Sequence, residues 1–193
     1  MNNVLIINAH HYYPFSEGKL NAALVEKAAN TLAAKGYQIR QITITEEVDV
    51  DEQLANLQWA DTVILQVPSN WMGVPWPFKK YMDEVFTAGM GGALCVGDGR
   101  SETEPNKNYG TGGTLTGKKY MLSLTFNAPA AAFEDEAEFF AGSSVDDLML
   151  PMHMNFKFFD MLPLPTFSCF DVMKNADVES DFKRFDAHLE QNF

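Results

Sequence analysis

Basic residues are scarce in this sequence, and their scarcity limits the partners that the chain can have. It contains 14 Lys and Arg against 26 Asp and Glu, which gives a formal net charge of −12. Phosphate backbones and anionic lipid surfaces attract proteins mainly through Lys and Arg. We therefore expect no nucleic acid partner. An anionic ligand would have to be held by local backbone dipoles and a few cations.

Cysteine and long apolar runs are also lacking. The two cysteines, Cys95 and Cys169, lie far apart and form no C-x-x-C motif, so we expect neither a disulfide framework nor a zinc site. No apolar run approaches the roughly 18 residues of a membrane span. The first residues carry no basic segment of the kind that opens a secretory signal. The sequence therefore predicts a cytoplasmic protein without membrane insertion.

What the sequence does have is the composition of a packed core. Hydrophobic residues make up 46% of its 193 residues, and no linker interrupts them, so we expect a single domain over residues 1–193. Short apolar runs alternate with stripes of helical period. The expected strands are 4–9, 37–44, 62–67, 119–125 and 164–170, and the expected helices are 20–32, 50–59, 77–86, 145–160 and 178–189.

This alternation predicts an α/β fold with a doubly wound, five-stranded parallel sheet and helices on both faces. Ligands of such sheets bind beyond the carboxyl ends of the strands, where the strand order reverses. Three loops are therefore expected to carry the function, namely residues 10–19, 68–77 and 126–135.

The first of these loops has the residues of an anion site at a helix N-terminus. Ser16 is expected to cap the helix and donate its hydroxyl to a phosphate, Gly18 lets the backbone approach closely, and Lys19 adds positive charge. The same residues also suit an ordinary helix start. His10 and His11 are neighbours whose side chains diverge, so no metal site is expected.

The second loop combines two tryptophans, three prolines and a glycine. Prolines stiffen a loop and lower the entropy lost when it holds a ligand. A rigid segment with Trp, Met and Gly can offer an apolar wall and backbone groups to a flat ring system such as isoalloxazine. The alternative is that Trp71 and Trp76 cover the core or a dimer contact.

Three groups of residues, taken in this order, carry a resemblance to a known family. They are Asn8-Ala9-His10 with Ser16-Glu17-Gly18-Lys19-Leu20-Asn21, then Asn70-Trp71-Met72-Gly73-Val74-Pro75-Trp76 with Lys79-Lys80-Tyr81, and finally 117–125 with Asn127-Ala128-Pro129. Over nearly its whole length the chain resembles the flavodoxin-like NAD(P)H:quinone reductases, most closely the MdaB (modulator of drug activity B) group.

This resemblance implies a flavodoxin-like sheet of order 2-1-3-4-5, a bound FAD, NADPH as electron donor, a quinone as acceptor, and a homodimer with sites near the subunit interface. It implies two-electron transfer in which hydride passes from NADPH to flavin N5 and then, after exchange of the ligands, to the quinone. The implied cofactor contacts are His10, Ser16, Glu17, Gly18, Leu20, Asn21, Ser69, Asn70, Trp71, Met72, Gly73, Tyr109, Thr125, Phe126, Asn127 and Ala128.

Hydroquinone formation also needs a proton, and Tyr109 and His153 are the catalytic candidates, because both residue types can donate one. For His153 the alternative is a structural role, since it sits among Met and Phe residues that suit core packing. Asn70 and Phe126 depart from the family pattern, which leaves the shape of the quinone pocket open.

Other functions fit the same fold. A reductase of azo or nitro compounds would share the half-reaction with NADPH, and the sequence does not separate it from a quinone reductase. A flavodoxin-type FMN electron carrier normally has a more compact phosphate loop after its first strand. A relative without flavin would leave the aromatic loop at 68–77 without a purpose.

Overall fold

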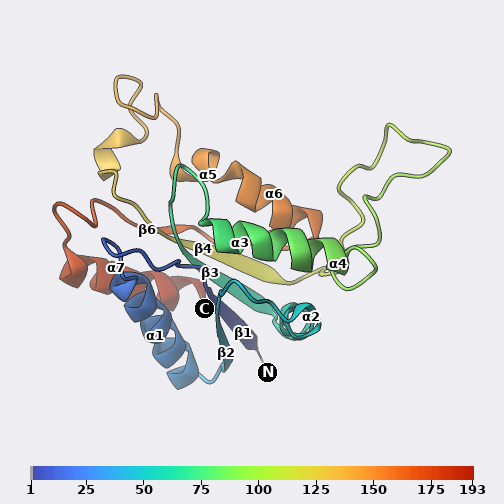
Figure 1. The fold of residues 1–193 in the computed structure, drawn as a ribbon, viewed down its shortest axis with the longest axis horizontal. Coiled ribbons are helices and arrows are strands. Elements are labelled where there is room, and N and C mark those ends of the chain that lie inside the picture. Colours follow the sequence, from blue (N-terminus) through green and yellow to red (C-terminus); the bar gives the residue numbers. More distant parts are fainter. Residues whose placement is uncertain (1) are drawn as a thin grey trace.

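The computed structural model describes residues 2–193, and its centre is a parallel sheet. The strands follow the order β2-β1-β3-β4-β5, and β6 also pairs with β4. This is the predicted flavodoxin-like order, and helices cover both faces of the sheet (Figure 1). The bounds are β1 Asn3–Asn8, β2 Gln38–Thr43, β3 Thr62–Pro68, β4 Lys119–Thr125, β5 Leu162–Pro163 and β6 Phe167–Cys169.

The sheet has six strands rather than the five expected, because the short β5 precedes the predicted last strand, of which residues 167–169 form β6. Both β5 and β6 pair in parallel with β4, and the residues between them leave the ladder. Pro163 and Pro165 stand at this interruption. Proline has no backbone N–H to donate, so it does not continue a regular ladder.

Two hydrophobic clusters hold the helices on the sheet. One joins the sheet to α1 (Lys19–Ala34) and α7 (Val178–Asn192). The other joins it to α2 (Val50–Trp59), α3 (Trp76–Tyr81), α5 (Val145–Leu148) and α6 (Leu150–Phe158). After α3 the helix continues as the π-helix η1 (Met82–Phe86) and the short α4 (Thr87–Gly89), and η2 (Ala130–Ala132) is a 3₁₀ turn.

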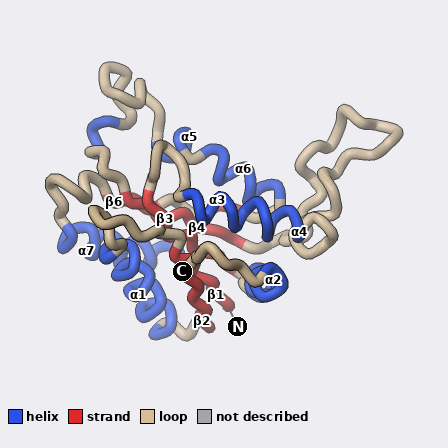
Figure 2. Tube along the Cα trace, in the orientation of Figure 1, coloured by secondary structure: helices blue, strands red, loops and turns tan. Residues whose placement is uncertain are grey.

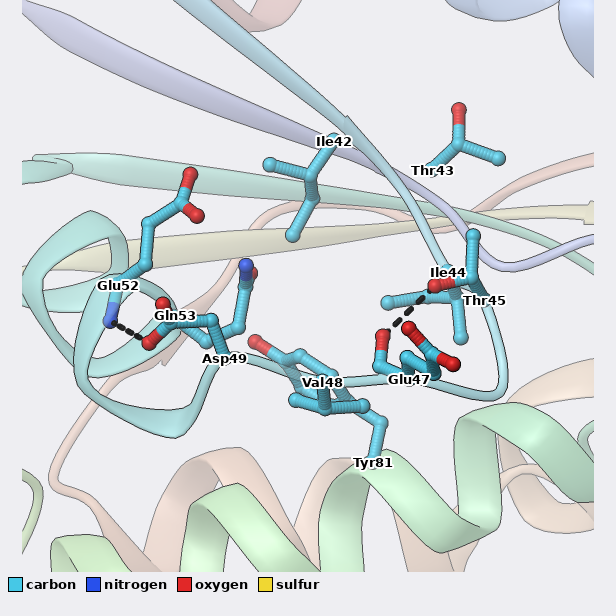
Figure 3. Close-up of a pocket in the computed structure, with 10 residues that line it drawn as sticks. All are labelled: Ile42, Thr43, Ile44, Thr45, Glu47, Val48, Asp49, Glu52, Gln53 and Tyr81. Atoms are coloured by element: carbon cyan, nitrogen blue, oxygen red, sulfur yellow. Dashed lines mark hydrogen bonds between the residues drawn. The ribbon is translucent and has the colours of Figure 1, made fainter.

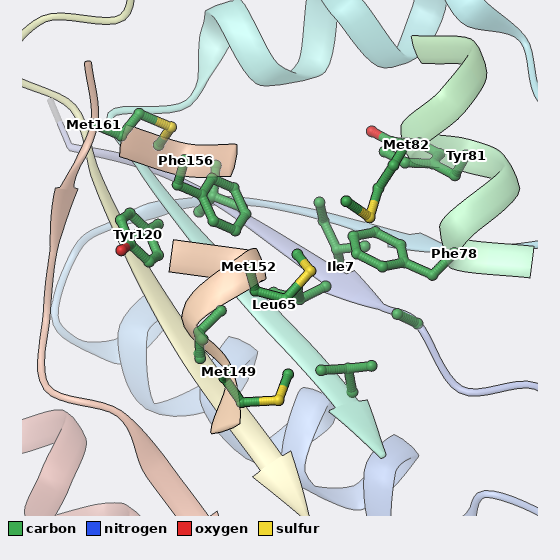
Figure 4. Close-up of a cluster of buried hydrophobic side chains, with 14 of the residues drawn as sticks. Ile7, Leu65, Phe78, Tyr81, Met82, Tyr120, Met149, Met152, Phe156 and Met161 are labelled. Atoms are coloured by element: carbon green, nitrogen blue, oxygen red, sulfur yellow. The ribbon is translucent and has the colours of Figure 1, made fainter. Parts of the chain in front are cut away.

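The methionine and phenylalanine residues near α6 pack in the core, as their composition predicts. Met149, Met152, Phe156 and Met161 are all buried. Figure 4 shows them over the sheet residues Leu65 and Tyr120. This cluster is therefore not a cofactor site.

Two helix boundaries differ from the prediction for local reasons. The single helix expected over 145–160 is broken at Met149, and Pro151 follows in the first turn of α6. Proline inside a helix removes a hydrogen bond and clashes with the carbonyl four residues earlier. At α1 the N-cap is Gly18, with no capping side chain, so the expectation that Ser16 caps this helix is wrong.

The segment between α4 and β4 projects from the molecule as a long loop (Figure 2). It returns at the amino edge of the sheet, where the Lys119 amide donates to the carbonyl of Asp61 just before β3. The three predicted ligand loops leave the opposite, carboxyl edge. In the described part of the chain, no helix is long and apolar enough to cross a membrane.

Candidate functional site

A cleft opens at the carboxyl ends of β1, β3 and β4, where the sequence predicts a ligand. Its volume is about 780 Å³, within the range of small-molecule sites. Among the predicted cofactor contacts, its walls contain His10, Ser16, Glu17, Gly18, Leu20, Asn21, Ser69, Asn70, Trp71, Thr125 and Asn127. Outside the lining lie Met72, Gly73, Tyr109, Phe126 and Ala128.

Sequence reasoning missed one wall of this cleft, formed by residues 172–174. These residues begin three positions after the end of β6, and a sheet places the carboxyl ends of parallel strands at one edge. The same rule that selected the other loops could therefore have found them. Their contribution includes Lys174, a second cation beside the cleft.

The N-terminus of α1 supplies the polar end of the cleft. Gly18 has a φ of 83°, and the first helical hydrogen bond runs from the Ala22 amide to the Gly18 carbonyl at 2.9 Å. The first amides of the helix, from Lys19 to Asn21, therefore have no carbonyl within the helix to bond. Such amides, together with the helix dipole, form an anion site.

Gly18 also makes room for a histidine. A Cβ at this position would lie 2.4 Å from Nδ1 of His10, far inside contact distance. His10 Nε2 lies 3.5 Å from Oγ of Ser16, so the ring contacts both predicted phosphate-binding residues. Burial lowers the pKa of His10, and a contact with the Ser16 backbone opposes that shift.

The two adjacent histidines point to different surroundings, as expected. His11 packs edge-on against Tyr13 and Trp76, with ring centroids 4.9 and 5.5 Å away. Within residues 2–193, no three His, Cys, Asp or Glu side chains gather as a metal site.

The positive charge expected from Lys19 is partly offset by its neighbour. Lys19 Nζ lies 2.6 Å from a carboxylate oxygen of Glu17, and the hydrogen bond to Glu17 raises the pKa of Lys19. An anion in the cleft would compete with Glu17 for this ammonium group. The backbone amides of α1 are then the fixed part of the anion site, because no side-chain rotation removes them.

The aromatic loop forms a tight turn that presents Trp71 to solvent. Asn70 and Gly73 exchange two backbone hydrogen bonds of 2.9 and 3.0 Å. Trp71 and Met72 between them have φ angles of 50° and 61°, a conformation that costs energy for residues with a Cβ. Trp71 is 96% exposed, so in one subunit it does not cover the core.

The third loop is divided between the cleft and the core. Thr125 and Asn127 face the cleft. Phe126 is buried, stacks on Phe170 with ring centroids 5.6 Å apart, and donates its amide to the carbonyl of Cys169. This position argues against a ligand contact by the Phe126 side chain, because alternate residues after a strand point to opposite sides.

Comparison with known proteins agrees with this fold. The family model described as "Flavodoxin-like fold" matches residues 2–193. The chain belongs to the flavodoxin-like fold family. It is 44% identical, over 99% of both chains, to "NADPH:quinone oxidoreductase MdaB" of Haemophilus influenzae.

Solved structures with this flavodoxin-like fold are more distant in sequence. A putative quinone reductase from Klebsiella pneumoniae has a TM-score of 0.75 at 22% identity, over 99% of this chain and 83% of that one. The general stress protein 14 of Treponema denticola, in complex with FMN, has a TM-score of 0.65 at 18% identity, over 99% of both chains.

Tyr109 does not reach the cleft of its own subunit in this flavodoxin-like chain. It lies on the long loop at the amino edge, is 71% exposed, and contacts Phe158 and the guanidinium of Arg100 at ring distances of 5.8 and 5.5 Å. Tyr109 is therefore absent from the lining of this cleft, and its contact with a flavin stays a prediction.

His153 also lies away from the cleft, and both its ring nitrogens are occupied. Nδ1 lies 2.7 Å from the Tyr120 hydroxyl, and Nε2 lies 3.1 Å from a carboxylate oxygen of Asp146. Burial, with a smaller contribution from Asp146, raises the pKa of Tyr120 to about 12. These two contacts give His153 a structural role within its subunit, and its role as proton donor to a quinone stays a prediction.

A chain of buried polar side chains lies beneath the cleft floor. Asn21 and Thr125 belong to the lining, while Gln66 and Ser123 lie deeper between the sheet and α1. Sequence reasoning did not select the deeper pair. Their signal was visible, since each is the polar interruption of an otherwise apolar strand.

A second cavity of about 540 Å³ lies near the end of β2, between α2 and α3 (Figure 3). It contains none of the predicted site residues, and its charged residues Glu47, Asp49 and Glu52 are acidic. Among the described residues, the hydroxyl of Tyr81 and Oε1 of Gln53 have no hydrogen-bond partner there. An acidic lining does not suit an anionic ligand.

Proposed function

We propose that this chain is an FAD-dependent NADPH:quinone oxidoreductase that works as a cytoplasmic homodimer. The observation that carries the proposal is one cleft that combines the free amides of α1 with the exposed indole of Trp71. An anion site and a flat apolar surface together suit a flavin nucleotide. The 44% identical relative named as an NADPH:quinone oxidoreductase supports the choice of reaction.

The residues present fit the diphosphate of FAD. The amides of the first turn of α1 would donate to its oxygens, and the Ser16 hydroxyl stands beside His10 at the same end of the cleft. Gly18 keeps this approach open, since a Cβ there would occupy the space of the His10 ring. In an acidic chain, these fixed dipoles offset the overall repulsion of the ligand.

The turn at 69–73 and the loop at 125–128 would frame the flavin ring. The Ser69 amide donates to the Thr125 carbonyl at 2.9 Å, which holds the two loops side by side. Trp71 is presented by a strained turn, and strain of this kind is typical of ligand-binding segments. A rigid frame of this type orients a ring without ordering the loop at the time of binding.

A flavin held in this cleft would supply the hydride chemistry, two-electron transfer through N5 between NADPH and a quinone that use the same place in turn. The protein's part is to orient the ligands and to offer preorganised amides to developing negative charge. Because both ring nitrogens of His153 already have hydrogen-bond partners, we favour the Tyr109 hydroxyl of a second subunit as the proton donor in hydroquinone formation. A homodimer would bring that loop to the cleft.

The alternative candidates differ in cofactor and acceptor. The Treponema denticola structure carries FMN, so an FMN-dependent reductase of azo or nitro compounds, or an FMN electron carrier, is the second candidate. The polar loop of residues 10–18 ahead of α1 is longer than a compact carrier loop, which favours the dinucleotide.

The test begins with purified full-length protein. We expect it to retain a yellow flavin that is identified as FAD after release, to be bleached by NADPH without oxygen, and to recover its colour on addition of a quinone. FMN that NADPH does not bleach would favour the electron carrier. Faster recovery with an azo dye than with any quinone would favour the azo reductase, and failure to bind FAD or FMN would refute the proposal.

A further inference from the structure

Two buried residues outside the cleft lining, Gln66 and Ser123, belong to a hydrogen-bonded chain that ends at the cleft floor. The Ser123 hydroxyl donates to Oε1 of Gln66 at 2.6 Å, and Nε2 of Gln66 donates to Oδ1 of Asn21 at 2.8 Å. Oγ1 of Thr125 lies 3.3 Å from Nδ2 of Asn21, from which it accepts, and 3.4 Å from Oδ1 of the same amide, to which it can donate. Ser123 and Gln66 are 0% and 1% exposed, so water does not compete for these bonds.

The strand register explains how the chain forms. Gln66 of β3 lies opposite Ser123 of β4, and the next pair toward the carboxyl edge on the same face is Pro68 and Thr125. On this face, further from the edge, the residues Ile64 and Met121 are apolar and pack beneath α1 and α7. The polar side chains thus begin where the sheet approaches the cleft. Burying polar groups there costs free energy unless each of them has a hydrogen-bond partner.

The sequence of donors and acceptors along these hydrogen bonds fixes the orientation of the Asn21 side-chain amide. A glutamine amide has one acceptor oxygen and one donor nitrogen, so a Gln66 whose oxygen accepts from Ser123 turns its nitrogen toward Asn21. Asn21 must then use its oxygen for Gln66 and turn its own nitrogen toward Thr125 and the cleft. Nδ2 carries two hydrogens, and Thr125 is its only acceptor among the described residues.

Asn21 stands in the first turn of α1, so its backbone amide is also one of the free donors of the anion site. We infer that Gln66 and Ser123 are positioning residues that hold the Asn21 side chain with its N–H toward a phosphate group in the cleft. The inference rests on the proposed flavin function and deepens it. It assigns a binding role to two residues that contact no ligand themselves.

The direct test reverses the amide. In Gln66→Glu, studied at a pH high enough to ionise this buried carboxyl, both oxygens can only accept, so Asn21 must turn Nδ2 toward residue 66 and present Oδ1 to the cleft. An acceptor facing a phosphate repels it. We expect affinity for FAD and for ADP, which carries the diphosphate with adenosine but without the flavin ring, to fall about 10- to 100-fold, as for the loss of a hydrogen bond to a charged group.

Riboflavin separates positioning from general damage, because it has the ring system and no phosphate. The Gln66→Glu variant should bind riboflavin as well as the wild type does, within about twofold. Ser123→Ala removes the first donor of the chain without adding charge. Ser123→Ala should also lower the ratio of FAD affinity to riboflavin affinity, by a smaller factor than Gln66→Glu. It provides the test if Gln66→Glu does not fold.

Asn56→Leu is the matched control. Asn56 is also a buried amide and lies in α2, away from the cleft, where its Oδ1 accepts a 2.9 Å hydrogen bond from Arg40 of β2. This variant should lose stability but keep all three affinities. Each affinity is measured by titration calorimetry on the full-length chain after bound flavin is removed by dialysis, and folding is checked by thermal melting.

Two results would overturn the inference. If the Gln66 and Ser123 variants weaken the binding of FAD, ADP and riboflavin by the same factor, the hydrogen bonds among these side chains have only a structural role. If neither variant changes any affinity, Asn21 is not directed by Gln66. A wild-type chain that binds none of the three ligands would refute the proposed function itself, which distinguishes that failure from a failure of the positioning role alone.

Discussion

Replacing Gly18 with alanine should cost the protein more than replacing Gly36, although both glycines flank the same helix. Both have left-handed backbones, with φ angles of 83° and 89°. An added Cβ at either site costs about 1–2 kcal/mol in that conformation. At Gly36 the Cβ would meet nothing within 4 Å, so this backbone cost is the whole effect expected there.

At Gly18 a steric cost is added, because the Cβ would lie 2.4 Å from Nδ1 of His10, 2.6 Å from Cε1 and 2.8 Å from Cγ. The ring must move by about 1 Å to reach ordinary contact, and overpacking of this kind costs about 1–3 kcal/mol more. For a chain of this length, each kcal/mol lowers the melting temperature by about 2–4 °C.

The assay is urea unfolding of both single variants, together with titration of FAD. Gly18→Ala should lose more stability than Gly36→Ala and bind FAD more weakly, while Gly36→Ala keeps the wild-type affinity. Adding His10→Ala to Gly18→Ala should recover the excess loss of stability, since the two side chains would no longer meet. Equal losses from the two glycine substitutions would refute the assignment of His10 and Gly18 to one packed unit.

Three further predictions concern buried groups away from the cleft. Tyr81→Phe removes a buried hydroxyl that has no partner among the described residues, so the free energy of unfolding in urea should stay the same or rise by up to about 1 kcal/mol, and a clear loss would contradict this. Cys95 and Cys169 are fully buried and burial raises the pKa of both thiols, that of Cys169 to about 12, so a thiol reagent at pH 8 should label neither until the chain unfolds. Burial also lowers the pKa of His188 from its ordinary 6.5, so the unfolded chain binds more protons and stability should fall as the pH drops below 6.5; in His188→Gln that acid-side loss should be smaller, and an unchanged pH profile of the melting temperature would contradict it.

Local sequence patterns determined which segments become strands and helices. The apolar run at 119–125 is β4 with the predicted bounds, and the stripe at 50–59 is α2. Such patterns work because burial on both faces of a parallel sheet demands a continuous apolar strand, and a helix on its surface needs a 3.6-residue period. The three ligand loops followed from these elements, since parallel strands end at a common edge.

Only the tertiary structure decided which side chains meet at that edge. Phe126 turns into the core, while Tyr109 returns at the opposite edge and His153 bonds to Tyr120 and Asp146. The contacts of Gln66 with Asn21 and Ser123 join residues 45 and 57 positions apart. Periodicity reports how each segment is buried, but such distant contacts depend on strand register and on where the helices pack, and no local pattern contains that information.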